Sequence, residues 1–307
     1  MSRVLITGGA GFIGTALANR LKNLNHDVTI IDLEKKFTSL HDSFAKYSLD
    51  IRNYENFKKI EHLEFDYIFH LAAQTASAIS QEEPELDVDT NVKGTLNICN
   101  YARKCKAKKI IFTSSMATYG NKEGKIKESD IQTPLSNYGV SKVAGEYYIN
   151  MFKQFGIEST IFRLFNVYGP GQDMSNLRQG MASIFMAQSI ISEEIKVTGS
   201  FERYRDFVYI DDVVDALILG LDNITDGQVY NVGSEEATTV KELIDLIIEV
   251  NNKAKSQFKI TNIGSHEGDQ FGSKADATKL KSLGWTPKTD LKDGLEKMYI
   301  YAKEVLV

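Results

Sequence analysis

Short apolar runs alternate with longer stretches of helical periodicity through the first half of the chain. The apolar runs are rich in β-branched and aromatic residues, which favours strands, and the stretches between them are long enough for helices. The pattern predicts strands at 4–7, 28–32, 67–70, 110–114 and 159–164, and helices at 12–24, 92–105 and 138–155. Because parallel strands need crossover connections, this order predicts an α/β fold of the Rossmann type, with a doubly wound parallel sheet.

The pattern becomes less regular after residue 166. Helices are predicted at 176–190, 211–221, 240–250 and 291–302. The runs 207–210 and 228–232 look like strands that return to the first sheet. We therefore expect a Rossmann domain over 1–166, with returning segments near 207–232, and a smaller α/β domain that lies mainly in 167–307.

The predicted helix 138–155 has a wider apolar surface than one sheet contact requires. Its polar positions Glu146, Asn150 and Lys153 occupy a narrow arc, and the additional apolar arc comprises Val140, Ala144, Tyr147, Tyr148, Met151 and Phe155. A helix that rests on one sheet needs an apolar stripe of only about 100°. The surplus predicts a homodimer through the helices 92–105 and 138–155, and the alternative is that a loop or the second domain covers this surface.

The composition is that of an ordinary globular protein, with 42% apolar and 25% charged residues among 307. The net charge of −5 and the absence of a Lys/Arg cluster give no reason to expect a nucleic-acid or membrane partner. No apolar run reaches the roughly 18 residues of a membrane span. Met1 to Arg3 lead directly into the first strand instead of a signal peptide, so we expect a cytoplasmic protein.

Neither the cysteines nor the histidines form a recognisable metal motif. Cys99 and Cys105 are six residues apart in a predicted helix, which places them on different faces. The histidines at 26, 41, 62, 70 and 266 are scattered. We therefore predict no metal site and no disulfide.

A glycine-rich run, Thr7 to Gly14, joins the first strand to the first helix. Gly8 would allow a tight turn, Gly11 would let the backbone approach a pyrophosphate, and Gly14 would permit close packing of the helix. Asp32 ends the second strand about 20 residues further on, where a carboxylate can bind both ribose hydroxyls and repel a 2′-phosphate. This context favours NAD over a purely structural turn, although Lys35 and Lys36 leave NADP open.

Tyr138 and Lys142 are four residues apart, so a helix would place a phenol and an ammonium on one face. A nearby cation lowers the pKa of a phenol by favouring the phenolate. The pair is therefore a candidate general base, although an isolated Tyr-x-x-x-Lys also fits a half-buried Tyr beside a solvated Lys.

Together with Ser114 and Ser115, these two motifs make the chain resemble the extended short-chain dehydrogenase/reductase family. The resemblance runs almost from end to end and is strongest to nucleotide-sugar epimerases and dehydratases such as UDP-galactose 4-epimerase. Further matching stretches are Asp50-Ile51, His70 to Gln74, Asn91, Arg163 to Gly171, Arg205 to Val213 and Tyr230 to Gly233.

The resemblance implies a catalytic role for three residues. Ser115 would hydrogen-bond the hydroxyl on carbon 4 of the sugar, Tyr138 would remove its proton, and Lys142 would contact the nicotinamide ribose. NAD would accept the hydride. The cofactor-binding residues implied in this way are Gly8, Gly11, Phe12, Ile13, Gly14, Asp32, Asp50, Ile51, Leu71, Ala72 and Ala73, together with Tyr138 and Lys142.

For the substrate, the resemblance implies that Asn166 and Arg205 meet the phosphates of a nucleotide sugar. A guanidinium can bind phosphate oxygens in a bidentate manner. The alternative for Arg205 is an ion pair with Asp206 or Asp211. Asn91 would be structural and hold the backbone near Lys142.

The two residues after Ser115 bear on the reaction. Dehydratases of the family have Asp-Glu there, and decarboxylating relatives have Glu at the second position, whereas this chain has Met116 and Ala117. Neither side chain can transfer a proton. We therefore expect a 4-epimerase with tightly bound NAD. The alternatives are a 4-dehydrogenase or 4-ketoreductase, a dehydratase, or a non-catalytic NAD-binding regulator.

The substrate expectation rests on the segment 265–276. His266 stands where the epimerase pattern usually has an Arg that binds the pyrophosphate, which leaves the nucleotide open. Asp269 and Ser273 are the predicted substrate residues here. Ser273 occupies a position that is Tyr in some galactose-specific epimerases, and its small side chain predicts that N-acetylhexosamine forms are accepted along with UDP-glucose and UDP-galactose.

Overall fold

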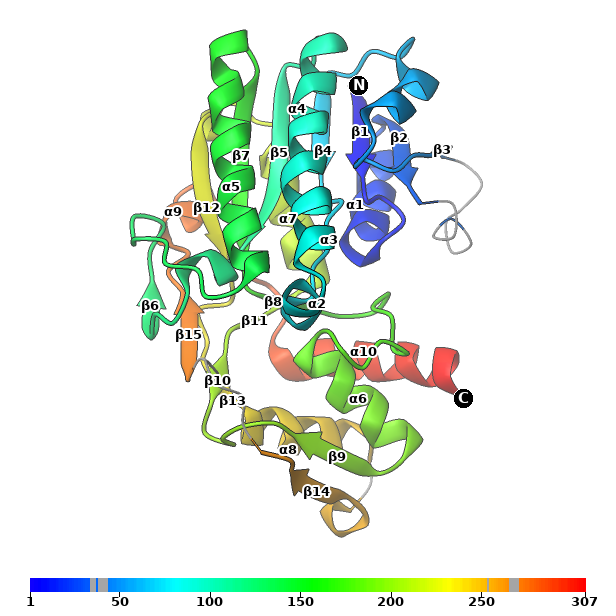
Figure 1. Ribbon diagram of the computed structural model, residues 1–307. Helices are drawn as coiled ribbons and strands as arrows, with labels where there is room; N and C mark the ends of the chain where they lie inside the picture. Colours follow the sequence, from blue (N-terminus) through cyan, green and yellow to red (C-terminus); the bar gives the residue numbers. More distant parts are fainter. Residues whose placement is uncertain (34–36, 38–43, 253, 265–270) are drawn as a thin grey trace. The chain divides into compact units, whose positions relative to one another are not determined.

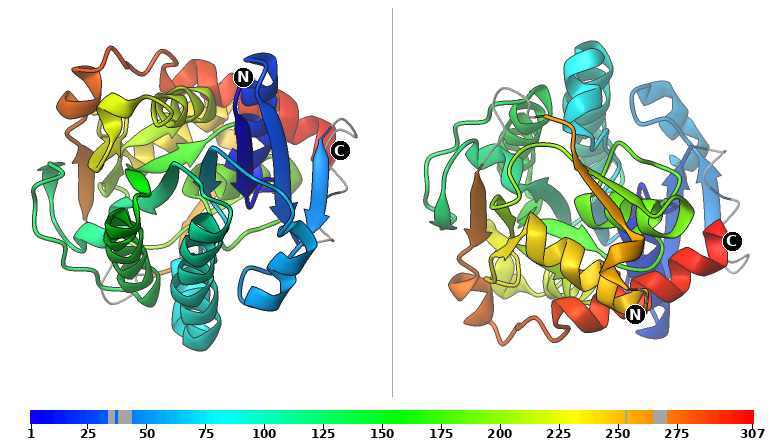
Figure 2. Two further views of the ribbon diagram at one scale, coloured as in Figure 1. Left: turned by 90° about the horizontal axis from the view of Figure 1, so that it is seen from above. Right: turned by 90° about the horizontal axis from the view of Figure 1, so that it is seen from below.

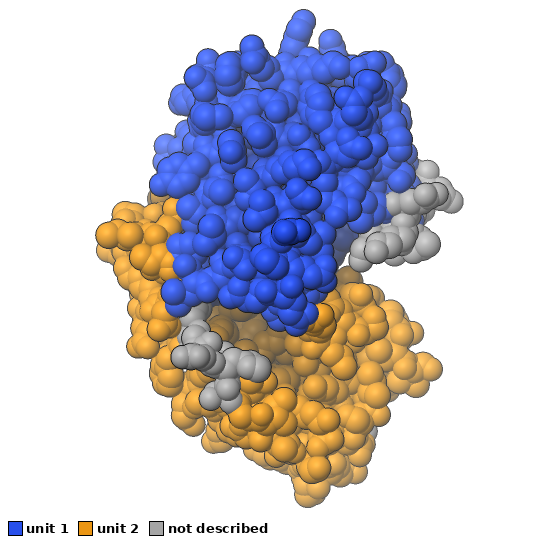
Figure 3. Space-filling view, in the orientation of Figure 1, with its two compact units in different colours: residues 1–118, 134–163, 214–230 blue, residues 119–133, 164–213, 231–307 orange. Residues whose placement is uncertain are grey.

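The computed structural model describes residues 1–33, 37, 44–252, 254–264 and 271–307. These residues form two compact units, which are coloured separately in Figure 3. Unit 1 comprises residues 1–118, 134–163 and 214–230, and unit 2 comprises residues 119–133, 164–213 and 231–307. The chain therefore passes between the units several times, whereas the expected division had one main boundary at residue 166 and returning segments near 207–232.

A seven-stranded sheet forms the centre of unit 1, with the strand order β12-β7-β5-β4-β1-β2-β3. The pairs β1–β2, β1–β4, β2–β3 and β4–β5 are parallel. The strands are β1 (Arg3–Thr7), β2 (Asp27–Asp32), β3 (Ala45–Ser48), β4 (Tyr67–His70), β5 (Lys109–Ser115), β7 (Glu158–Leu164) and β12 (Gln228–Val232). This order confirms the predicted Rossmann-type α/β fold.

Helices cover both faces of this sheet (Figures 1 and 2). The helices α4 (Gly94–Lys104) and α5 (Asn137–Met151) lie on one face, and α1 (Phe12–Asn23) and α7 (Ile210–Leu219) lie on the other. Short 3₁₀ turns occupy Tyr54–Ile60, Met116–Tyr119, Phe152–Phe155, Asn223–Thr225 and Lys255–Gln257. No helix among the described residues is long and apolar enough to span a membrane.

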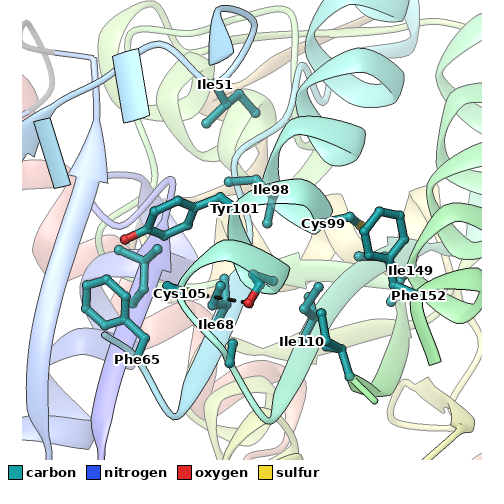
Figure 4. Packing of buried hydrophobic residues seen from close by; sticks show 14 of the residues in the cluster. Ile51, Phe65, Ile68, Ile98, Cys99, Tyr101, Cys105, Ile110, Ile149 and Phe152 are labelled. Carbon is teal, nitrogen blue, oxygen red and sulfur yellow. Dashed lines mark hydrogen bonds between the residues drawn. The ribbon is translucent and has the colours of Figure 1, made fainter. Parts of the chain in front are cut away.

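The core between the sheet and the helices α4 and α5 is shown in Figure 4. Ile68 of β4 and Ile110 of β5 belong to the same buried cluster as Ile98 of α4, Ile149 of α5 and Phe152 of the following 3₁₀ turn. Tyr101 is fully buried in this cluster, and its hydroxyl donates a hydrogen bond of 2.9 Å to the carbonyl of Ile60. The burial of apolar area on this face holds α4 and α5 in place.

The predicted helix 92–105 is longer and less regular in the structure. It is preceded by α2 (Ser77–Glu82) and α3 (Pro84–Asp87), and the π-helical segment Val88–Lys93 leads into α4. A π-helical turn is rare and often marks a functional position in a helix.

A buried ion pair joins α5 to the sheet. Arg163 of β7 donates two hydrogen bonds to the carboxylate of Glu146, from Nε at 2.9 Å and from Nη2 at 2.6 Å. The hydroxyl of Ser114 on β5 donates to the same carboxylate at 2.5 Å. All three residues are buried. The planar fork of the guanidinium defines the distance and the rotation of α5 relative to β5 and β7.

Unit 2 contains short strands in several small sheets, with the orders β13-β10-β15-β6, β11-β8 and β14-β9. The strands are β6 (Gly124–Ile126), β8 (Asn166–Tyr168), β9 (Glu194–Val197), β10 (Tyr204–Arg205), β11 (Phe207–Tyr209), β13 (Thr238–Thr239), β14 (Lys259–Asn262) and β15 (Gly272–Ala275). The helices are α6 (Met181–Ile191), α8 (Val240–Val250), α9 (Thr278–Lys281) and α10 (Leu291–Leu306).

Two predictions for the second half of the chain require correction. The run 207–210 does not return to the large sheet, because β11 pairs in parallel with β8. The helix predicted from residue 176 begins at Met181 instead, after Gly180, whose φ of +85° is incompatible with a continuous helix. The run 228–232 does form the edge strand β12 of the large sheet.

Candidate functional site

The glycine-rich turn between β1 and α1 has the geometry of a dinucleotide cradle. Gly8 has a φ of +68°, and a Cβ atom on it would lie 2.7 Å from the backbone nitrogen of Ala72. A Cβ atom on Gly14 would lie 2.2 Å from the carbonyl oxygen of Gly8. Gly11 is the N-cap of α1 and gives the helix no side-chain cap. The first amide groups of α1 therefore remain suited to an anion such as a pyrophosphate.

Asp32 lies at the carboxyl end of β2, beside this turn. Its carboxylate accepts hydrogen bonds from the backbone amides of Ala10 at 3.0 Å and Leu33 at 2.7 Å. The side chain therefore supports the glycine turn and places a negative charge beside it. A carboxylate in this position fits the two ribose hydroxyls of NAD. Lys35 and Lys36, which left NADP open, lie outside the described residues.

The other expected cofactor residues lie along the same edge of the sheet. Phe12 and Ile13 form the first turn of α1, and Leu71, Ala72 and Ala73 directly follow β4. The turn after β4 is anchored because the hydroxyl of Thr7 accepts a hydrogen bond of 3.1 Å from the amide of Ala72. This edge is where open α/β sheets bind ligands.

Asp50 and Ile51, the expected adenine contacts, are engaged within the protein. The carboxylate of Asp50 forms an ion pair of 2.6 Å with Arg52, which holds the pKa of Asp50 below its usual value. Ile51 is buried in the apolar core of unit 1 and packs against the backbone of Gly94.

Tyr138 and Lys142 both belong to the first half of α5. The helix is capped by Ser136, whose hydroxyl accepts a hydrogen bond of 3.1 Å from the amide of Gly139. Lys142 is 3% exposed, and its ammonium donates a hydrogen bond of 3.0 Å to the carbonyl of Thr113 on β5. The ammonium lies 5.8 Å from the centre of the Tyr138 ring. The two side chains therefore share one face of the helix, as their spacing predicts.

The close approach of α5 to the end of β5 brings Ser115 to the same place. A Cβ atom on Gly139 would lie 2.6 Å from the carbonyl oxygen of Ala117, so only glycine permits this approach. The hydroxyl of Ser115 accepts a hydrogen bond of 3.1 Å from the amide of Ala117 and lies close enough to the phenol of Tyr138 to lower its pKa. Ser115, Tyr138 and Lys142 thus meet within unit 1.

Burial dominates the ionisation of the pair. It raises the pKa of Tyr138 to about 12, against the opposing effect of the hydrogen bond from Ser115. It lowers the pKa of Lys142 to about 8, while Asp87 and Glu146 act in the opposite direction. The expectation was a lowered Tyr138 pKa, but burial and the charge of Asp87 raise it, because transfer into a low-dielectric site penalises the phenolate.

A polar network near the pair joins Asn91, which was expected to be structural, to Gln74 and to two residues that the sequence pattern did not identify, Asp87 and Ser141. The amide nitrogen of Asn91 lies within hydrogen-bonding distance of the carbonyl of Gln74 (2.9 Å), of Asp87 Oδ1 (3.0 Å) and of the hydroxyl of Ser141 (3.1 Å). The amide of Gln74 donates to the side-chain oxygen of Asn91 at 2.8 Å. The i, i+4 spacing of Asp87 and Asn91 is a signal that would have indicated this contact.

Unit 2 brings together three of the expected substrate residues. Asn166 begins β8, and both its backbone amide and its side-chain amide donate to the carbonyl of Asp206 at 3.0 Å. Arg205 of β10 pairs in register with Ser273 of β15. The hydroxyl of Ser273 is buried and has no hydrogen-bond partner among the described residues. Asp269 and His266 lie outside the described part of the chain.

Asp206, one of the two alternative ion-pair partners of Arg205, has other contacts. The fully buried carboxylate of Asp206 instead accepts hydrogen bonds from the backbone amides of Ser234, Glu235 and Ala275 at 2.6, 3.0 and 2.9 Å. The guanidinium of Arg205 donates at 2.8 Å to the carbonyl of Tyr204. Asp206 is therefore a structural residue that positions the backbone around Arg205.

A family model described as the NAD dependent epimerase/dehydratase family matches residues 4–233. The chain belongs to this family. The match includes both the dinucleotide cradle and the residues Ser115, Tyr138 and Lys142.

Individual relatives extend the similarity over the whole chain. A putative UDP-glucose 4-epimerase of Methanocaldococcus jannaschii is 34% identical over 306 residues, which cover 98% of each chain. The crystal structure of a UDP-glucose 4-epimerase from Thermotoga maritima with UDP-glucose has a TM-score of 0.92 at 34% identity and covers 99% of this chain and 100% of that one. A UDP-N-acetylglucosamine 4-epimerase from Methanobrevibacter ruminantium, in complex with UDP-N-acetylmuramic acid, has a TM-score of 0.90 at 28% identity, and the similarity covers 99% of each chain.

Replacement of the carboxylate beside the cradle tests the cofactor site. We expect Asp32→Ala to weaken the binding of NAD by about tenfold to a hundredfold, because hydrogen bonds to charged groups contribute about 1.5–3 kcal/mol each. NADP should lose less affinity than NAD, because the repulsion of its 2′-phosphate disappears with the carboxylate. Isothermal titration calorimetry with both dinucleotides measures this change. An equal loss for NAD and NADP would contradict the assignment of Asp32 to the ribose.

Proposed function

We propose that this protein is an NAD-dependent 4-epimerase of a nucleotide sugar. The observation that supports this proposal most directly is the meeting of Ser115, Tyr138 and Lys142 at the carboxyl end of β5, beside a dinucleotide cradle. The residues that follow Ser115 are Met116 and Ala117, which supply no further acid or base. A site with one proton-transfer group suits a reaction that begins and ends with an alcohol on the same carbon.

In the proposed reaction, the phenolate of Tyr138 takes the proton of the hydroxyl on carbon 4, while Ser115 hydrogen-bonds the same oxygen. When bound, NAD would supply the hydride acceptor and donor for carbon 4, and Gly8, Gly11, Gly14 and Asp32 would hold it beside β1. The sugar becomes a 4-keto sugar, presents its opposite face and receives the hydride again. Tyr138 then returns the proton to the new hydroxyl, so protons and electrons balance without net consumption of the cofactor.

Lys142 makes this proton transfer feasible at moderate pH. Its ammonium is buried near the Tyr138 ring, where a cation favours the phenolate. Burial raises the pKa of Tyr138 to about 12, so formation of the phenolate limits the rate of the proposed reaction at neutral pH. Arg205 and Asn166 are the residues of unit 2 proposed to hold the phosphates of the substrate.

Other reactions of the family are less well supported. A dehydratase or decarboxylase of the pattern described above needs a carboxylate after Ser115, and this position has none. A net 4-dehydrogenase or 4-ketoreductase would exchange its cofactor in each turnover. A non-catalytic regulator would not need the buried Lys142 or its contact with Thr113.

We further propose that the substrates include N-acetylhexosamine nucleotides as well as the glucose and galactose forms. Ser273 has a small side chain whose buried hydroxyl has no hydrogen-bond partner in the described part of the chain. An unpartnered buried hydroxyl is costly, so a polar group of the substrate would stabilise it. The names of the similar epimerases include both UDP-glucose and UDP-N-acetylglucosamine.

A homodimer is proposed through α4 and α5. The side chains of Val140, Tyr147, Met151 and Phe155 are 53%, 73%, 46% and 42% exposed, and they lie on α5 and the 3₁₀ turn that follows it. Four large apolar side chains on adjacent turns form a patch suited to a second copy of the same surface across a two-fold axis.

Incubation with nucleotide sugars tests the proposed reaction. The purified protein with NAD is incubated with UDP-, GDP- and dTDP-sugars, and the products are identified by NMR. We expect inversion at carbon 4 for at least one UDP-sugar. Tyr138→Phe should lower the rate by about a hundredfold or more, because a positioned acid or base contributes about 10²–10⁴-fold. Tyr54→Phe, which removes a hydroxyl from a partly exposed Tyr remote in sequence from the site, is the control. A stable 4-keto-6-deoxy product would overturn the epimerase proposal.

Two substitutions of Ser273 test the substrate proposal. Ser273→Tyr should lower the efficiency with UDP-N-acetylglucosamine far more than with UDP-glucose, because the large side chain occupies the space of the acetamido group. Ser273→Ala keeps the space and should leave the ratio of the two efficiencies nearly unchanged. Thermal melting establishes that each variant folds. The idea is wrong if a folded Ser273→Tyr variant keeps the wild-type ratio.

Introducing charge on the exposed patch tests the dimer. Tyr147→Glu combined with Met151→Glu should shift the chain to a monomer in light scattering at micromolar concentration, because two carboxylates would be buried across the two-fold axis. Ile300→Glu places the same charge at an exposed apolar position of α10 and should leave the mass unchanged. A wild-type chain that is already a monomer would exclude this dimer.

A further inference from the structure

Besides Glu146, a second buried carboxylate, that of Asp87, lies near Tyr138 and Lys142 and has no part in the reaction proposed above. Asp87 is the last residue of α3, at the point where the chain enters the π-helical segment Val88–Lys93. The residue is 0% exposed. A carboxylate so far from water needs either protonation or a nearby positive charge.

The hydrogen bonds of Asp87 come from neutral groups. Its Oδ1 atom accepts from the side-chain amides of Asn91 at 3.0 Å and Gln74 at 3.2 Å. Its Oδ2 atom is buried without a hydrogen-bond partner among the described residues. Neutral amides satisfy lone pairs but do not cancel a charge, so these contacts leave the charge of the carboxylate uncompensated.

Lys142 is the cation that faces this charge. Burial raises the pKa of Asp87, and a contact with Ser141 and the attraction of the Lys142 ammonium partly offset this effect. The reverse effect is also present, because Asp87 raises the pKa of Lys142, and it does so more strongly than Glu146. Glu146 is held in a bidentate ion pair by Arg163. The charge of Glu146 is therefore largely cancelled, which leaves Asp87 as the anion available to Lys142.

None of the other titratable groups near Asp87 supplies a negative charge to Lys142 in its place. His70 of β4 is buried and neutral, because burial lowers its pKa to about 3. Tyr138 of α5 is neutral until it acts as the base. Asp89 and Lys93 of the π-helical segment pair with one another, and their side chains are about half exposed.

We propose that Asp87 is the counter-ion of Lys142 and a positioning residue for the catalytic pair. Its carboxylate keeps Lys142 in the ammonium form, and its contact with Asn91 orients the amide that reaches Ser141. The hydroxyl of Ser141 donates at 3.0 Å to the carbonyl of Tyr138, so the network ends at the catalytic residue. This assignment rests on the proposed function of Tyr138 and Lys142.

The variant Asp87→Asn tests the charge with little change of shape. The carbonyl of the new amide can accept both existing hydrogen bonds, and its NH₂ group takes the place of Oδ2, which has no partner to lose. A negative charge favours the ammonium of Lys142 and disfavours the phenolate of Tyr138, so its removal lowers both pKa values. Both limbs of the profile of kcat/KM against pH should move to lower pH by about one unit.

The control is Asp89→Asn, which removes the same charge from an exposed position two residues away. This variant should keep the wild-type profile, since solvent screens exposed charges. A purely structural role of Asp87 would lower the height of the profile without moving its limbs. Either that result or an unchanged Asp87→Asn profile would overturn the proposal.

A titration without turnover separates this proposal from the proposed function. The ultraviolet absorbance of the Tyr138 phenolate, obtained by subtracting the titration of the Tyr138→Phe variant, should appear at lower pH in Asp87→Asn than in the wild type. If the wild type converts no nucleotide sugar, the proposed function is wrong, but this titration still tests the role of Asp87.

If Asp87→Asn does not fold, the carbon-13 resonance of the Asp87 carboxyl in the wild-type protein tests the proposal instead. An ionised carboxylate at neutral pH supports the proposal, and a protonated one overturns it.

Discussion

The burial of one ammonium group at the end of β5 is the constraint on which the rest of unit 1 depends. Lys142 reaches the carbonyl of Thr113 only because α5 lies very close to the strand. Glycines permit this approach, since a Cβ atom on Gly145 would lie 2.8 Å from the ring of Phe112 and one on Gly139 would touch the backbone of Ala117. The same approach brings Ser115 to Tyr138. Helix packing and catalytic geometry therefore have one physical cause.

Buried charge in this region is balanced by two different arrangements. Glu146 and Arg163 cancel one another through a bidentate contact that joins α5 to β7, and such a pair is costly to break because each partner would remain charged in a dry site. Asp87 is held by neutral amides, and its charge acts on Lys142 instead. The first arrangement supplies rigidity, and the second favours the ammonium form of Lys142.

In unit 2, a buried carboxylate bound to backbone amides positions the proposed substrate residues. Its strands are short, and the buried carboxylate of Asp206 gathers the backbone amides of three separate positions into one place. Arg205 and Ser273 are held beside it through the β10–β15 register. Residues presented on short strands and loops can change with little effect on the core of the fold, which suits a family whose relatives act on different sugars.

The sequence by itself determined the long elements of unit 1, the glycine turn with Asp32 and the spacing of Tyr138 and Lys142, whereas the expectation for Ser115 came from the family resemblance. The first three of these depend on local periodicity or on a fixed spacing along the chain. Only the tertiary structure revealed the pairing of β11 with β8 and the two-residue to four-residue strands of unit 2, because such short strands have no periodicity to detect. It also decided the ionisation of the site. Burial and the charges of Asp87 and Glu146 come from residues far apart in the sequence, and their effect on Lys142 exists only once the chain has folded.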